Sequence, residues 1–236
     1  MSYEEADTLL RENKLPSKLN EIAKEHKSSR ERNGAIRLNL PKTDIKLRDQ
    51  KVLVIPLLES ESREMISEFM VLAGRAIAMF SIENNISMPY LLQDSGKFSD
   101  EIIENINNLS LSKTFEAAKG FNRSKLSVKP SLHAGLGLNE YLRVTSPMRR
   151  YMDLLVQQQL VRFISNLTLL NESEIKERIK VNNSSSSKIN KAIRQSVEHF
   201  RCLYFKQNRN WKGDGVVVEK SGNCLLYTSP SPRDRG

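Results

Sequence analysis

The sequence predicts an α+β fold rich in helices, followed by the first strand of a second domain. Apolar residues recur at intervals of three and four over residues 62–84, which is the period of a long amphipathic helix. Residues 36–40 and 45–55 alternate between apolar and polar side chains, as short strands do. A second amphipathic stretch covers 147–164, and the valines at 216–218 are typical of a strand.

Composition narrows the class of protein. The 236 residues include 37 Lys and Arg against 28 Asp and Glu, a formal net charge of +9, and 39% are hydrophobic, enough for a folded core. No stretch reaches the roughly 20 apolar residues of a membrane span and the start is polar, so we expect neither a span nor a signal peptide. Two cysteines are too few for a disulfide framework. The positive charge favours a polyanionic partner, although a solvated basic surface explains it equally well.

The first third of the chain predicts two helices and then strands. Ser2 precedes two glutamates, the pattern of a helix start, and this helix is expected to end near residue 10. A second helix is expected from Ser17 to the Asn-Gly pair at 33–34. The alternation at 36–40 predicts a half-buried strand, and 45–47 with 52–55 predict a hairpin around Asp49-Gln50.

The later elements follow the helix at 62–84. Helical periodicity returns at 100–106 and 113–119, and the stretch 147–164 is expected to be helical throughout. The Asn/Ser-rich segment 182–187 predicts a linker between two further helices, at 172–180 and 188–204.

The last residues of the chain resemble the translation of a sequencing adaptor. Residues 224–234 back-translate in frame to a common sequencing adaptor, so we interpret 224–236 as non-native and expect the natural gene to continue beyond residue 223.

The segment 131–153 carries the predicted chemistry. Thr145 or Ser146 is expected to cap a helix that begins at Pro147, so that Arg149 and Arg150 lie in its first turn. Cations there oppose the helix dipole, whereas a bound anion reverses that penalty, and arginine suits phosphoryl oxygens. Asp153 is expected to hold Arg149. An ordinary surface ion pair on a capped helix remains the alternative.

Two glycines and a histidine precede that helix. Gly135 and Gly137 allow the backbone to approach a ligand or a neighbouring element closely. His133 suggests a ligand or base, but we expect a structural hydrogen bond instead.

These residues resemble a known family. Residues 135–138 (Gly-Leu-Gly-Leu) and 145–153 (Thr-Ser-Pro-Met-Arg-Arg-Tyr-Met-Asp) are similar to the signature of the ribonuclease II/RNase R (RNB) family of 3′–5′ exoribonucleases. Residues 62–74 and 30–35 resemble two further family segments in the same order. The resemblance implies that residues 1–204 are the helix-rich C-terminal part of an RNB catalytic domain. Residues 205–223 would then be the start of an oligonucleotide-binding barrel.

The family implies processive, magnesium-dependent hydrolysis of single-stranded RNA to nucleoside 5′-monophosphates. Arg149 matches the family's catalytic arginine, which would neutralise charge on the scissile phosphate. Tyr3 matches an aromatic residue that clamps the last nucleotide with a helix glutamate; Ser67 stands at the clamping position, and Glu68 is the retained glutamate. A core-facing Tyr3 and a Glu68 that acts only indirectly remain alternatives. The RNA-binding residues implied are Tyr3, Glu68, Gly135, Gly137, Arg150 and Tyr151.

The family holds magnesium through an aspartate cluster that this sequence lacks, so no metal ligand is predicted here. We therefore expect Met1 to be an internal methionine and the chain alone, as a fragment, to be inactive. The whole protein is expected to be a monomer, in the cytoplasm or an organelle, without a membrane partner. Two other hypotheses are a non-catalytic RNA-binding module and a helical interaction domain.

Overall fold

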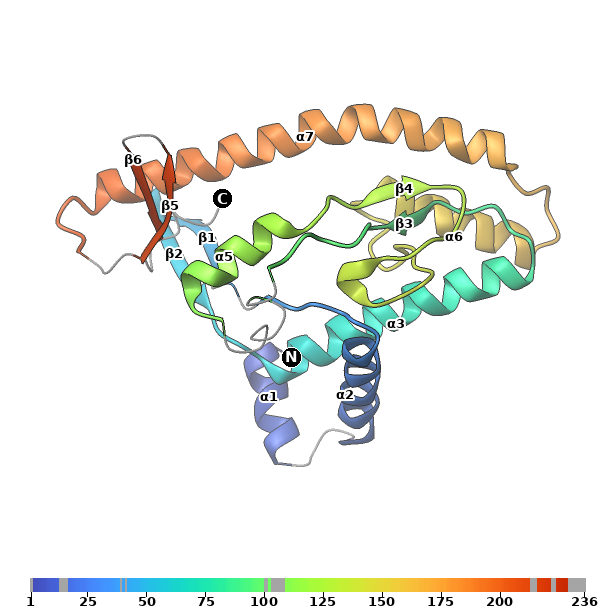
Figure 1. Cartoon of the computed structure of the whole chain (residues 1–236), viewed down its shortest axis with the longest axis horizontal. Helices are drawn as coiled ribbons and strands as arrows, with labels where there is room; N and C mark the ends of the chain where they lie inside the picture. The colour runs from blue at the N-terminus through green and yellow to red at the C-terminus, as the bar shows by residue number, and fades with distance from the viewer. Residues whose placement is uncertain are drawn as a thin grey trace. The chain divides into compact units, whose positions relative to one another are not determined.

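The computed structural model describes residues 2–12, 17–38, 40, 42–99, 102, 109–212, 216–221 and 224–228 (Figure 1). Helices and two-stranded antiparallel sheets alternate along the chain, as the predicted α+β class requires. The elements are α1 (Tyr3–Arg11), α2 (Ser17–Arg32), β1 (Lys42–Arg48), β2 (Lys51–Leu57), α3 (Glu61–Glu83), β3 (Tyr90–Leu92), α5 (Leu111–Gly120), β4 (Lys125–Ser127), a short 3-10 helix (Ala134–Leu136), α6 (Tyr151–Ile164), α7 (Glu172–Gln207), β5 (Val216–Ser221) and β6 (Cys224–Thr228).

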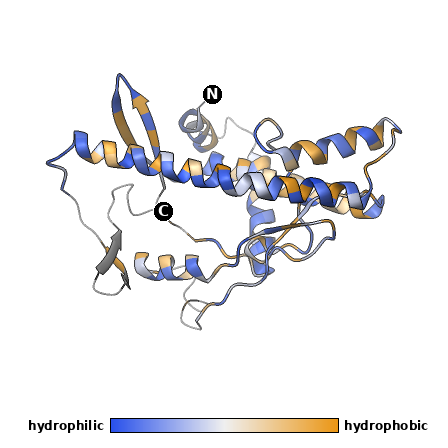
Figure 2. Cartoon of the chain, turned by 90° about the horizontal axis from the view of Figure 1, so that it is seen from above, coloured by the Kyte–Doolittle hydropathy of each residue, from blue (hydrophilic) through white to orange (hydrophobic). Residues whose placement is uncertain are grey.

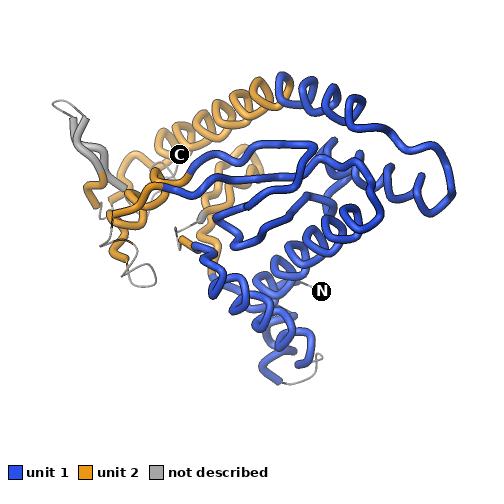
Figure 3. Tube along the Cα trace, turned by 45° about the vertical axis from the view of Figure 1, so that its right-hand side comes forward, with its two compact units in different colours: residues 1–36, 59–96, 122–184 blue, residues 37–58, 97–121, 185–236 orange. Residues whose placement is uncertain are grey.

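The chain divides into two compact units (Figure 3). Unit 1 comprises residues 1–36, 59–96 and 122–184, and unit 2 comprises 37–58, 97–121 and 185–236. The core of unit 1 packs α3 and the segment that follows it against α6, through the buried residues Ala78, Ile86, Met88, Tyr90, Leu142 and Val156. A second cluster joins α6 to the first half of α7, through Met152, Leu155, Ile175 and Ile179.

Helices α1 and α2 both contact α3. Ser2 and Glu5 form a complete capping box at the start of α1, as the sequence predicts, and Ser60 caps α3. On the α2 side, the Lys27 ammonium lies 2.6 Å from the Glu64 carboxylate. The sequence predictions for α1, α2 and α3 are confirmed to within one or two residues.

Helix α3 is long and apolar enough, by length and composition alone, to cross a membrane, and it is the only such helix in the described part of the chain. Core helices of other folds meet the same criterion, so the expectation of no membrane span is not overturned. Glu68 of α3 is buried in an ion pair with Arg30 of α2, and α1 packs on the same helix. We therefore treat α3 as a helix that packs within unit 1 through part of its surface.

Gly74 brings α3 into contact with a distant segment. A Cβ at this position would lie 2.5 Å from Cε2 of Tyr141 and still closer to the carbonyl oxygen of Leu142. Because that oxygen belongs to the backbone, it has little freedom to move away. A glycine is therefore required where α3 meets the strand-like segment that leads to the site.

The predicted hairpin is confirmed as β1–β2. Arg48 pairs with Lys51, and the two residues between them, Asp49 and Gln50, have φ of 48° and 62°. Two consecutive positive φ values are characteristic of a two-residue type I′ turn, which matches the twist of the flanking strands. In unit 2, the Gln207 amide bonds both Val52 N–H and the Gln50 carbonyl, so the end of α7 is tied to this hairpin.

The strand expected at 36–40 is not present, since residues 35–38 and 40 adopt no regular structure. The alternation of apolar residues there is real, but no described strand lies alongside to pair with it. A period of two predicts which side chains share a face, and hydrogen bonding to a neighbour decides whether a strand forms.

The linker expected at 182–187 is also wrong, because α7 runs without interruption for 36 residues. Asparagine and serine lower helix propensity by only about half a kcal/mol each relative to alanine, so a short run between good helix formers need not end a helix. Hydrophilic and hydrophobic residues alternate along α7 (Figure 2).

The strand expected near 216–218 is confirmed as β5, which pairs with β6 (Cys224–Thr228) in unit 2. The adaptor origin of 224–236 stays a prediction, and in this chain 224–228 form the second strand of that hairpin.

Candidate phosphate-binding site

Arg149 and Arg150 lie in a turn before α6, not inside it. Helix α6 begins at Tyr151, and its N-cap is Arg150, which makes no side-chain capping bond. The Ser146 carbonyl accepts hydrogen bonds from the backbone N–H groups of Arg149 (3.3 Å) and Arg150 (3.1 Å). The predicted start at Pro147 is therefore wrong by four residues: the Ser-Pro signal opens a turn, and the helix follows it.

Asp153 holds this turn on the first turn of α6. It is fully buried, and its Oδ2 accepts from the Ser146 N–H at 2.9 Å and from Arg150 Nε and Nη2 at 3.0 and 2.7 Å. The sequence analysis assigned Asp153 to Arg149, and the structure corrects this to Arg150. One carboxylate oxygen of Asp153 thus fixes both the turn and the Arg150 side chain. Of the two neighbouring arginines, Arg150 therefore has a structural role.

Arg149 is left exposed by the same geometry. Within the residues that the structure describes, its guanidinium makes no ion pair or hydrogen bond, although its neighbour is fully engaged. Tyr151, the first residue of α6, is 44% exposed. The turn therefore presents an uncommitted planar cation next to an accessible aromatic ring, which suits a phosphoryl group attached to a nucleoside.

The glycine loop, residues 134–137, is held by Gln93 at the end of β3. The Gln93 carbonyl accepts from Ala134 N–H at 2.9 Å, and its side-chain Oε1 accepts from Gly135 N–H at 3.0 Å. Gly137 has φ of 62°, and a Cβ there would lie 2.8 Å from the Ala35 nitrogen. Of the two alternatives for Gly137, close approach to a ligand or to a neighbouring element, the structure shows the second.

Glu68 lies buried beneath this loop, 7% exposed. Its carboxylate is paired with the Arg30 guanidinium and lies 3.2 Å from Nδ1 of His26. Contact between Glu68 and RNA stays a prediction, and the partners observed for its carboxylate are both on α2.

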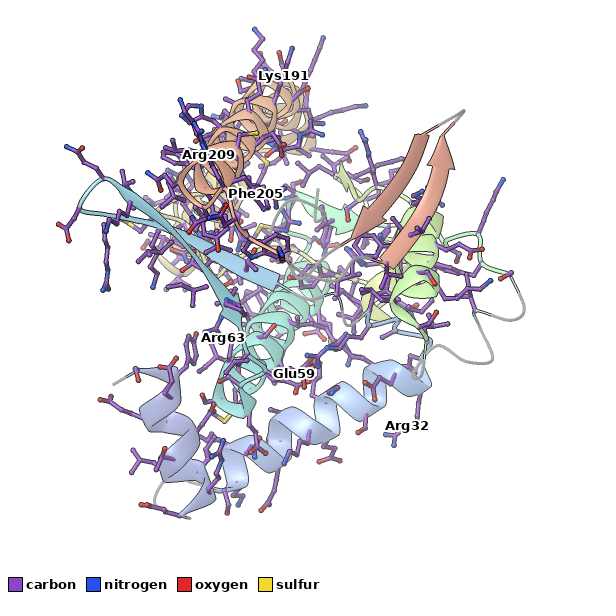
Figure 4. The ribbon with its side chains drawn as sticks, turned by 90° about the vertical axis from the view of Figure 1, so that its left-hand side faces the viewer. Arg32, Glu59, Arg63, Lys191, Phe205 and Arg209 are labelled. Atoms are coloured by element: carbon purple, nitrogen blue, oxygen red, sulfur yellow. The ribbon has the colours of Figure 1, made fainter. Side chains whose placement is uncertain are left out.

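Tyr3 lies at the start of α1, 40% exposed, so it is not a core residue. The guanidinium of Arg63, labelled on α3 in Figure 4, lies 4.7 Å from the centre of the Tyr3 ring, within cation–π distance. No local pattern predicts the contact between Arg63 and Tyr3. Arg63 directly follows Ser62, and the Ser62 hydroxyl donates to the Tyr3 carbonyl.

Tyr141 was also missed, although it connects the parts of the site. Burial raises the pKa of Tyr141, and the charges of Arg143, Arg150, Asp153 and Arg30 all act on its phenol. The contacts that the structure shows for the Tyr141 ring are with His133 at 5.7 Å and with the surface of α3 at Gly74. Nothing in the local pattern marks Tyr141, since it is placed by contacts with residues far away in the sequence: Gly74, His133 and the backbone N–H of Leu91.

His133 supports the loop as a structural residue. Its Nε2 lies 3.4 Å from the Ser124 hydroxyl, and its ring meets Tyr141 edge to face at 5.7 Å. Burial, with a smaller effect of Arg143, lowers the pKa of His133 from 6.5 to about 4.

This shift predicts a loss of stability in acid. Because the folded chain keeps His133 neutral, its contribution is complete above pH 6.5 and is lost as the pH falls through about 4. Between pH 6.5 and about 4, the free energy of unfolding of wild type should fall by up to about 3 kcal/mol more than that of His133→Gln. Urea unfolding at several pH values measures this. The exposed His199→Gln should keep the wild-type dependence, and an identical slope in His133→Gln would contradict the assignment.

A metal site does not fit the described residues. Among them, no group of three or more His, Cys, Asp or Glu side chains is placed to hold an ion. The magnesium expected from the family resemblance therefore has no ligand set in this part of the chain.

An exposed arginine on a turn that a buried carboxylate fixes is an arrangement that suits an anion-binding protein. The chain belongs to the RNB family, since residues 1–166 match the RNB domain. This confirms the resemblance drawn from residues 135–138 and 145–153.

Curated relatives and solved structures agree with that family. The chain is 31% identical over 227 residues to an uncharacterized ribonuclease of Synechocystis, covering 92% of this chain and 34% of the relative. It is 30% identical over 179 residues to the chloroplastic/mitochondrial ribonuclease II of Arabidopsis thaliana, covering 70% of this chain and 22% of the relative. The chain thus spans about a third or less of these relatives.

The fold is that of known exoribonucleases. The structure of an active-site mutant of the Dss1 exoribonuclease from Candida glabrata matches with a TM-score of 0.86 and 24% identity, over 98% of this chain and 32% of that one. Mycoplasma genitalium RNase R in complex with ribose-methylated single-stranded RNA matches with a TM-score of 0.77 and 19% identity, over 99% and 44%.

Proposed function

We propose that this chain is the part of an RNB exoribonuclease that binds the scissile phosphate and the 3′ end of single-stranded RNA. The observation that carries the proposal is the exposed Arg149, which has no partner among the described residues, beside an Arg150 that Asp153 holds in place. Family membership and the RNA complex of a structural neighbour support RNA as the substrate.

The proposed reaction is processive hydrolysis from the 3′ end. Water adds to the phosphorus, the bond to the 3′ oxygen of the preceding nucleotide breaks, and that oxygen takes a proton. Each step releases one nucleoside 5′-monophosphate. Arg149 stabilises the phosphate when it is five-coordinate and most negative, which is the kind of charge that a preorganised guanidinium stabilises well.

The other predicted residues have roles around the chain end. Tyr3 and Tyr151 are exposed and stack on bases, while Arg150 and the glycine loop support the phosphate site. Residues 205–223 open an oligonucleotide-binding barrel. Magnesium is part of the proposed reaction of the whole protein, and no step above uses a metal on the described residues. The whole protein is proposed to be a monomer in the cytoplasm or an organelle.

The proposal is tested by complementation. The chain is mixed with the part of the Synechocystis relative that it does not match, and 5′-labelled oligo(A) is followed over time with magnesium present. We expect progressive shortening from the 3′ end with release of AMP, which neither polypeptide gives alone. An oligo(A) of DNA is the control.

Binding is measured in parallel on the chain alone. Affinity for single-stranded RNA should fall steeply between about 50 and 200 mM salt, because each phosphate contact releases counterions. Absence of both binding and complementation would contradict the proposal.

A second candidate is a non-catalytic RNA-binding module. It is favoured by the net charge of +9, which suits a polyanionic partner whether or not a reaction follows. Salt-dependent binding without any hydrolysis in the mixed assay would decide for this candidate.

A further inference from the structure

We infer that Arg30 and Glu68 are positioning residues that together hold the glycine loop in place, so that Glu68 acts on RNA only through Arg30. The inference rests on the proposed function, because the loop is taken to line the RNA path.

The pair is buried and doubly bonded. Arg30 is 8% exposed and Glu68 is 7% exposed. Arg30 Nη2 donates to Glu68 Oε1, and Arg30 Nε donates to Glu68 Oε2 at 3.1 Å. Glu68 Oε2 also lies 3.2 Å from Nδ1 of His26. Both carboxylate oxygens are therefore occupied by side chains of α2, and a nucleotide would have to displace them to reach Glu68.

Arg30 holds the loop through its remaining donor. Its Nη1 donates to the Leu136 carbonyl at 3.1 Å, across 106 positions of sequence. Its own carbonyl oxygen accepts from Ala35 N–H at 2.9 Å and lies closer to the position of a Cβ on residue 137 than real contacts allow. The side chain of Arg30 thus bonds the loop while its backbone packs against the next residue, which leaves the loop little freedom to move.

The Arg30–Glu68 ion pair is better explained by its effect on the position of the glycine loop than by a contribution to the free energy of folding. A buried ion pair is often no more stabilising than apolar residues of the same volume, because desolvation offsets the attraction. Only a planar guanidinium can meet both oxygens of Glu68 and still donate to Leu136.

The first test measures the loop itself and needs no RNA. Hydrogen exchange is followed by mass spectrometry in the 236-residue chain and in Glu68→Gln, Arg30→Lys and Arg30→Met. We expect exchange over 133–138 to rise roughly tenfold or more in all three variants, with no change in the hairpin 42–57. Lysine keeps the charge but has a single nitrogen, so Arg30→Lys should not restore the loop.

Matched controls come from the same helices. Arg32→Met on α2 and Glu83→Gln on α3 each remove one charge at an exposed position, and Arg32 points away from the rest of the chain in Figure 4. Both should leave exchange of the loop unchanged. Unchanged exchange in Glu68→Gln and Arg30→Lys would overturn the inference. If these variants do not fold, the wild-type chain alone still tests the inference. Fast exchange of the Gly135 and Leu138 amides in the wild-type chain would overturn it.

The second test separates positioning from direct contact. Affinity for 5′-labelled oligo(A) is measured against salt in each variant. Arg30→Met should weaken binding without changing the salt slope, whereas loss of a phosphate contact lowers that slope by about one. Glu68→Gln should have no further effect in the Arg30→Met background. An independent effect of Glu68→Gln there, or a lower slope in Arg30→Met, would show direct contact and overturn the inference.

The two proposals fail in different ways. If the wild-type chain neither binds RNA nor complements the missing part, the proposed function fails, and the exchange experiment still tests the positioning of the loop. If RNA binds normally and the loop exchanges at the wild-type rate in every variant, only the inference fails.

Discussion

Arg149→Ala is expected to lower the rate of RNA hydrolysis in the complemented assay about 10³-fold. Arginines that reach a phosphoryl transition state contribute roughly 10³ to 10⁵ in rate in other phosphoryl-transfer enzymes, and we use the lower end because Arg149 is exposed. Arg149→Lys should recover part of the rate, since it keeps the charge but loses the planar pair of donors. RNA binding by the chain alone should lose about one unit of salt slope.

The control for Arg149 is Arg48→Ala in the β1–β2 hairpin. It removes the same charge from an exposed position in unit 2, so it accounts for the general effect of net charge on binding. Equal rates for wild type and Arg149→Ala would remove Arg149 from the reaction. Equal losses in Arg149→Ala and Arg48→Ala would show that only net charge matters.

Asp153→Ala is expected to destabilise the chain by about 2–4 kcal/mol. It leaves the Ser146 N–H and two nitrogens of Arg150 without their acceptor, and breaking a buried pair in this way costs roughly 3–5 kcal/mol. We expect a somewhat smaller value because the Arg150 side chain is 31% exposed and water reaches it. Thermal or urea unfolding of the full chain measures the effect.

Asp94→Ala is the matched control for Asp153. Asp94 also pairs with a cation, Lys125, at 3.0 Å, but both side chains are at least 60% exposed. Removing such a surface pair costs about 0–1 kcal/mol. If Asp153→Ala is no more destabilising than Asp94→Ala, the buried carboxylate does not fix the turn as described.

Local sequence signals predicted the elements whose causes are local. The capping residues of α1, the apolar periodicity of α3 and the turn at Asp49-Gln50 are local signals, and those elements were placed correctly. The strand at 36–40 failed because a strand needs a partner that its own sequence does not specify. The unbroken α7 shows the opposite case, in which neighbouring helix formers outweigh a run of weak ones.

The residues of the candidate site also divide into those that the sequence predicts and those that depend on contacts far away in the chain. Family resemblance led to Arg149, Arg150 and Asp153, but the pairing of Asp153 depends on where the helix begins, and spacing alone gave the wrong arginine. Tyr141 and Arg30 are in the site through contacts between segments that are far apart in sequence. Residues 30–35 resemble a family segment that includes Arg30, but the resemblance does not give its contacts, and no motif marks Tyr141.

The glycines at 74 and 137 have a genetic consequence. Each lies where two backbones nearly touch, so any side chain forces apart segments that belong together. A screen for inactive alleles should therefore recover substitutions at these glycines alongside substitutions at Arg149, even though neither glycine offers a functional group to RNA. Such alleles would act by loss of folding and not by a change in the chemistry of the site.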